Sequence, residues 1–135
     1  MICVNKQQPL RRRGMFSIEL VMALPILLFM LLGLFEFSFL FYARGDVVEA
    51  SRAGARLATL TGVYPEDVET EVRRSLKNRF GSQIQVDTEL GEFPGDEVVV
   101  AVRVPMNAAA PDLLWPIGYS IRDRYLIAET RMLKE

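Results

Sequence analysis

The sequence lacks the side chains on which most enzyme and metal sites depend. It has no histidine, and its one cysteine is Cys3. A disulfide framework and a Cys/His metal site are therefore excluded within this chain. The usual general base and thiol nucleophile are missing, and no glycine-rich phosphate loop occurs. We therefore expect no enzymatic activity, no cofactor, no metal and no small-molecule substrate.

The net charge is also small, −1 over the 135 residues. No basic patch of the kind that binds nucleic acid stands out, so we expect no nucleic-acid partner. The first 14 residues differ from the rest, because they hold Lys6 and the arginines at 11–13 but no acid. Such a basic leader favours a cytoplasmic N-terminus, although three arginines beyond the following apolar run weaken the bias.

A long apolar run follows this leader. Residues 16–43 contain only two charges, Glu19 and Glu36. A helix of about 20 apolar residues crosses a hydrocarbon core of about 30 Å, and this run is longer than a secretory signal peptide requires. We predict a transmembrane helix over residues 15–43 and an extracytoplasmic domain over residues 44–135.

The junction between leader and helix has a recognisable pattern. Three arginines and Gly14 are followed by Met15, and Glu19 is the fifth residue from Met15. This arrangement resembles the processing site of type IV pilin-like precursors, which implies cleavage by a prepilin peptidase between Gly14 and Met15. The leader, residues 1–14, would then be removed.

Two interpretations of Glu19 remain open. In an assembled fibre its carboxylate would pair with the N-terminal ammonium of a neighbouring copy, because a carboxylate near a membrane is costly unless it is paired. Otherwise its side chain extends to the cytoplasmic interface or is protonated.

Further motifs continue the pattern along the helix. Pro25, Gly33 and the cluster at 35–37 follow Glu19 in order, and the segment at 49–58 has the sequence EASRAGARLA. Together they resemble the TadE-like family, pseudopilins of the tight-adherence (Flp-type) pilus machinery. The resemblance implies a single-pass protein of the bacterial inner membrane. Its implied partners are membrane lipid, other pilin-like or Tad-type secretion proteins, and the prepilin peptidase.

The predicted function is thus a non-enzymatic pseudopilin that acts in pilus assembly or secretion through helix packing and an extracytoplasmic surface. The alternative is a membrane-tethered envelope domain that binds or scaffolds another protein without entering a fibre. The residues assigned to assembly or helix packing are Glu19, Pro25, Gly33, Glu36, Ala50, Gly54 and Ala58. Glu36 lies toward the far side of the span, where exposure at the interface is favoured over a helix–helix contact.

The helical pattern continues beyond the span to about residue 60. Ala50, Gly54 and Ala58 form a series of small residues four apart, which allows close approach of another backbone. They either receive a partner helix or make room for the protein's own sheet, and the second interpretation is favoured. The opposite face of this stretch is charged.

The remaining sequence predicts an α+β domain. Pro65 begins a second amphipathic helix that ends at Gly81. Alternating residues at 84–90 and 98–104 predict a hairpin, and residues 121–133 a third strand. The expected fold is pilin-like: a long helix, a second helix and a three-stranded antiparallel sheet. The apolar segment 106–118 is expected to fill the core rather than lie exposed near the membrane surface.

Overall fold

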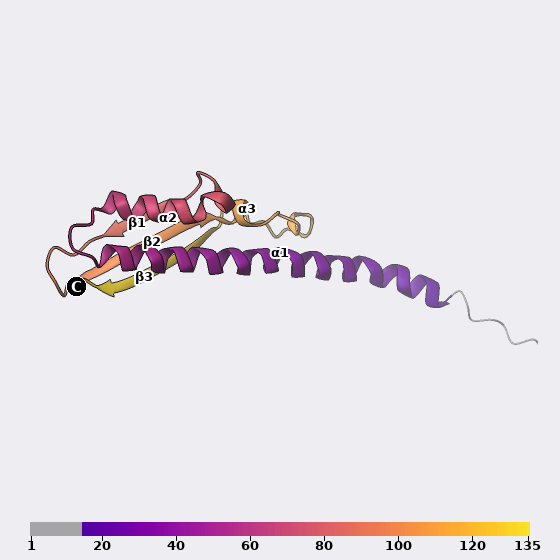
Figure 1. Cartoon of the computed structure of the whole chain (residues 1–135). Helices are drawn as coiled ribbons and strands as arrows, with labels where there is room; N and C mark the ends of the chain where they lie inside the picture. Colours follow the sequence, from indigo (N-terminus) through magenta and orange to yellow (C-terminus); the bar gives the residue numbers. More distant parts are fainter. Residues whose placement is uncertain (1–14) are drawn as a thin grey trace, which may run out of the picture.

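The computed structural model describes residues 15–135; the leader, with Cys3 and Gly14, lies outside the described residues. An extended helix carries an α+β head domain on its C-terminal half (Figure 1). The helix is α1 (Met15–Ala58). The head contains α2 (Pro65–Phe80), β1 (Gln85–Glu89), β2 (Glu97–Pro105), α3 (Met106–Ala109), the 3₁₀ turn η1 (Trp115–Ile117) and β3 (Tyr125–Leu133). The predicted α+β fold class is confirmed.

α1 is one helix of 44 residues that joins the apolar run to the head. At about 1.5 Å per residue it is about 66 Å long. Pro25 lies inside the helix without ending it. The predicted continuation beyond the apolar run is confirmed, with the last helical residue at Ala58.

α2 follows from local sequence signals. Pro65 occupies its first position, where a missing N–H costs no helical hydrogen bond. The Asp67 carboxylate accepts a hydrogen bond from the backbone N–H of Tyr64 at 3.1 Å. Gly81 ends the helix at a φ of 61°. The buried stripe contains Val68, Val72, Leu76 and Phe80.

The sheet has the order β1-β2-β3, and both pairs of neighbouring strands are antiparallel. Both long helices cover the same face, α1 over β2 and β3 and α2 over β1. Alternate residues of the central strand therefore form the middle of the core. Each of these side chains is fully buried: Val98, Val100, Val102 and Val104.

The other face of the sheet is open to solvent and charged. Arg131 pairs with Glu129 at 2.7 Å and with Glu97 at 3.6 Å. The hydrogen bond that the Arg131 guanidinium donates to Glu129, together with attraction from both carboxylates, raises the pKa of Arg131 above its usual value. These pairs are exposed, so they keep the face soluble and contribute little to stability.

One buried polar side chain links α1 to the sheet. Ser51 is fully buried, and its hydroxyl lies 2.9 Å from the Val100 carbonyl oxygen and 2.8 Å from Thr130 Oγ1. These contacts pair buried polar groups of the helix and of the two strands, and they fix the position of α1 on the sheet.

The third strand is shorter than the sequence indicates. It begins at Tyr125, because residues 121–124 form a turn in which the Arg124 N–H donates to the Ile121 carbonyl at 3.2 Å. Ile121 is fully buried, but it packs with Leu40 and Ala110 against α1 and does not extend the strand.

Candidate assembly surface on the long helix

The face of α1 that meets the head is filled by the head itself. Ala50, Gly54 and Ala58 are buried against α2 and the sheet. A Cβ at Gly54 would lie 2.6 Å from Val72 Cγ2 and 3.3 Å from Val100 Cγ1. In the folded chain these three positions are therefore occupied by α2 and the sheet and are not open to a partner helix. The favoured interpretation, that they make room for the protein's own sheet, is confirmed.

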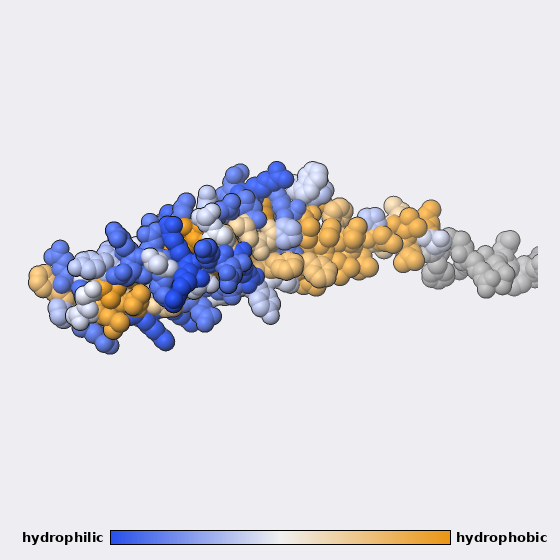
Figure 2. Space-filling view, turned by 45° about the horizontal axis from the view of Figure 1, so that its top comes forward, coloured by the Kyte–Doolittle hydropathy of each residue, from blue (hydrophilic) through white to orange (hydrophobic). Residues whose placement is uncertain are grey.

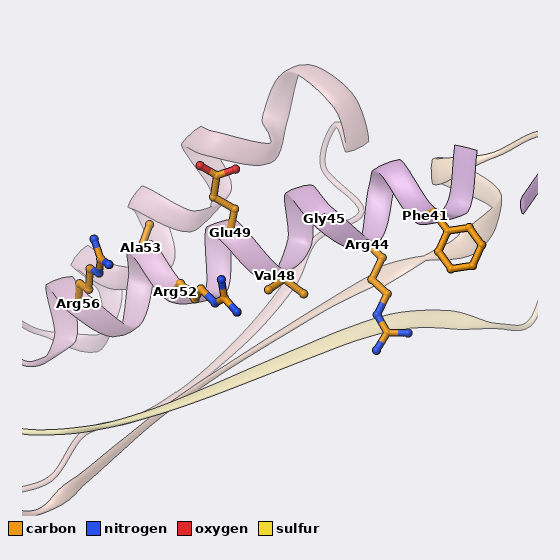
Figure 3. A pocket seen from close by; sticks show the side chains of 8 residues that line it. All are labelled: Phe41, Arg44, Gly45, Val48, Glu49, Arg52, Ala53 and Arg56. Carbon is orange, nitrogen blue, oxygen red and sulfur yellow. The ribbon is translucent and has the colours of Figure 1, made fainter. Parts of the chain in front are cut away.

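The opposite face of this half of α1 is uncovered and slightly hollow. Figure 3 shows the residues that line the hollow, all from α1: Phe41, Arg44, Gly45, Val48, Glu49, Arg52, Ala53 and Arg56. Their spacing of three and four residues places them along one side of the helix. Small side chains alternate with arginines, so a second helix could approach closely while its acidic groups meet the arginines.

The charges in this hollow have no ionic partner among residues 15–135. Every salt bridge found there involves other side chains, whereas Arg44, Arg52, Arg56 and Glu49 are exposed. Arg44 and Glu49 lie at the two margins of the hollow and point away from each other in Figure 3. The hollow therefore offers both signs of charge to a partner.

The N-terminal half of α1 is apolar on every side. Figure 2 shows this half as a hydrophobic rod projecting from a largely hydrophilic head. It is the candidate membrane span, with a mean hydropathy of 2.5 over its most apolar window and none of that window buried by the protein. Glu19 is exposed near its start.

Glu36 lies in a different environment from the one the sequence indicates. Its side chain is 0% exposed, so the expected exposure at the interface is wrong. Its Oε2 accepts hydrogen bonds from the backbone N–H groups of Leu113 at 2.7 Å and Leu114 at 3.0 Å. These two hydrogen bonds satisfy Oε2, whereas the buried Oε1 has no hydrogen-bond partner among the described residues. The partner that covers Glu36 is therefore a loop of the same chain rather than water or another helix.

That loop, residues 110–121, runs along α1 toward its N-terminus. Gly33 faces its buried Leu114, whose Cδ1 lies 3.6 Å from the position of a Cβ at Gly33. The expectation that this apolar segment fills the core is wrong for Trp115 and Ile117, which are exposed. It fails because the space under the sheet is already occupied by the two long helices.

Polar contacts join the two ends of the loop where it leaves the head, a region we call its neck. The sequence did not predict them. Asp112 accepts a hydrogen bond from Ser120 Oγ at 2.9 Å and lies 3.4 Å from Arg122 Nε. Within residues 15–135 there is no cluster of three or more side chains able to bind a metal ion.

The architecture defines a class: a helix long and apolar enough to cross a membrane, bearing an α+β head on its distal half. Residues 14–56 match the family model described as TadE-like protein. Over that segment the family resemblance drawn from the sequence is confirmed. The match includes the span, Glu36 and the hollow, and it ends before most of the head. No curated protein and no solved structure matches the chain.

Proposed function

We propose that this protein is a membrane-anchored pseudopilin that joins a Tad-type assembly through the uncovered side of α1. The observation that carries the proposal is the division of α1 into two faces. The head fills one face, whereas the apolar span and the hollow from Phe41 to Arg56 stay open along the same helix. A simple anchor requires only the apolar span and would not need an open, charged hollow beyond it.

The proposed mechanism is packing, not catalysis. Apolar helices associate in a membrane through close contact and a few polar groups. Glu19 is the polar group of the span, and the arginines of the hollow extend the contact beyond the membrane. The head then presents its charged sheet face outside. In this proposal the N-terminus is cytoplasmic, the protein lies in the inner membrane, and its partners are pilin-like proteins.

The proposal includes removal of the leader after Gly14 by a prepilin peptidase. Cleavage would give Met15 a free ammonium at the start of α1, where the Glu19 carboxylate of a neighbouring copy could pair with it. The intact mass of protein extracted from cells with an active peptidase tests this step. A mass that still includes residues 1–14 would contradict cleavage while leaving helix packing open.

A charge-only substitution tests the role of Glu19. Glu19→Gln keeps the size of the side chain and removes its charge, so the protein should still enter the membrane but lose co-purification with its pilin-like partners. Glu66→Gln, at an exposed carboxylate of α2, is the matched control and should assemble normally. A membrane-tethered scaffold that does not enter a fibre would be indifferent to both substitutions, so unchanged co-purification of Glu19→Gln with its partners would favour that alternative.

A further inference from the structure

The loop 110–121 is attached to α1 by a series of contacts that step toward the N-terminus of the helix. Ile121 packs on Leu40, and the Tyr119 ring lies 6.0 Å from that of Phe37. The next contact toward the N-terminus is Glu36, which binds the backbone of the loop, and the last is Gly33 against Leu114. The loop is therefore held against the helix down to the level of the apolar span (Figure 1).

The position of these contacts relative to the membrane follows from the length of the helix. A hydrocarbon core of about 30 Å takes about 20 helical residues. Counted from Phe16, the start of the apolar run, the core ends near Phe35. Gly33 and Glu36 thus lie at the membrane boundary on the side of the head, and residues 114–117 lie beside them.

The tip of the loop exposes apolar side chains at this boundary. Trp115 is 63% exposed and Ile117 is 56% exposed, with Pro116 exposed between them. Tryptophan is enriched where a membrane meets water, because its ring is apolar and its N–H is polar. The same level of α1 carries further exposed aromatic side chains: Phe35, Phe37, Phe39, Phe41 and Tyr42.

Four backbone N–H groups around the tip of the loop already have partners within the protein. Irregular backbone is tolerated at membrane depth only where its hydrogen bonds are satisfied by protein. The N–H groups of Leu113 and Leu114 bind Glu36, and those of Ile117 and Gly118 donate to carbonyl oxygens within the loop. The charged side chains Asp112 and Arg122 stay at the neck, on the side of the head.

We propose that residues 115–117 insert into the lipid at the membrane face from which the head emerges, with Glu36 holding the loop against α1. The occupant of this apolar patch is lipid because the patch is continuous with the span. Insertion at a second point would fix the tilt and rotation of the head relative to the membrane. The inference rests on α1 spanning a membrane and does not depend on fibre assembly.

Trp115 allows a direct test, because it is the only tryptophan in the chain. The full-length protein is reconstituted alone in phosphatidylcholine vesicles, with and without lipids brominated at shallow acyl carbons. We expect emission at short wavelength, strong quenching by bromine and several-fold weaker quenching by aqueous acrylamide than for the denatured chain. Bromine in both leaflets makes the result independent of orientation.

Two results would overturn insertion. One is emission at the wavelength of free tryptophan in water with no bromine quenching. The other is a short-wavelength emission that is lost when the protein is diluted in lipid, because a second copy would then be the group that covers Trp115.

The role of Glu36 is tested in the same vesicles. Glu36→Ala removes the acceptor and should reduce bromine quenching several-fold, whereas Glu36→Gln keeps an acceptor oxygen and should largely preserve it. Ser38→Ala is the neighbouring control, because Ser38 bonds only to Leu34 of its own helix. Hydrogen exchange of the β2 amides verifies that each variant is folded. Unchanged quenching in folded Glu36→Ala would refute the role of Glu36.

Discussion

The contact between α1 and the head makes a sharp prediction at Gly54. Replacement of glycine by alanine in a helix normally gains about 1 kcal/mol, because glycine loses more backbone freedom on folding. At Gly54 the new Cβ would lie 2.6 Å from Val72 Cγ2, 3.3 Å from Val100 Cγ1 and 3.4 Å from Val68 Cγ1. Overpacking of this kind costs about 1–3 kcal/mol.

The cost at Gly54 should fall at the upper end of that range, because all three neighbouring valines are buried and cannot move into solvent. We therefore expect Gly54→Ala to destabilise the head by about 1–2 kcal/mol after the helical gain is subtracted. Gly45→Ala is the matched control on the same helix. Nothing lies within 4 Å of a Cβ there, so this variant should gain about 0.5–1 kcal/mol.

Hydrogen exchange measures both effects in the full chain held in detergent micelles. The slowest β2 amides report the free energy of opening of the head. Their exchange should be faster than wild type in Gly54→Ala and slower in Gly45→Ala. Equal protection in the two variants would show that α1 does not pack on the head as described.

Two further substitutions probe other links between α1 and the head by the same exchange measurement. Ser51→Ala leaves the Thr130 hydroxyl and a buried carbonyl without their partner, so it should cost about 1–3 kcal/mol, and no change would refute the buried contact. Arg79→Ala breaks an ion pair with Asp46 that is more than a third exposed on the Asp46 side, so it should cost less than about 1 kcal/mol and less still in high salt.

Local patterns in the sequence predicted most of the secondary structure. The extent of α2 follows from Pro65 and Gly81, whose effects act within a few residues. The two strands of the hairpin follow from alternation, which reports burial on one face. The apolar part of the long helix follows from its length. Its continuation follows from helical spacing.

The parts that the sequence did not predict depend on contacts between distant residues. Glu36 binds a loop 77 residues away, so nothing near it in the sequence indicates burial. Ser51 contacts Thr130, 79 residues away, and resembles any serine in a helix. The small residues around Gly54 suit a foreign helix and the protein's own sheet equally, and only the packed head decides between them.

The central claim is that the uncovered side of α1 is an assembly surface, and crosslinking in pilus-producing cells tests it most directly. Cys3→Ser leaves the chain without a thiol, so Ala53→Cys then places one in the hollow and Thr70→Cys places one on exposed α2. We predict crosslinks to a pilin-like partner from position 53 and far fewer from position 70. If no crosslink forms from position 53 in cells that assemble pili, the account is contradicted.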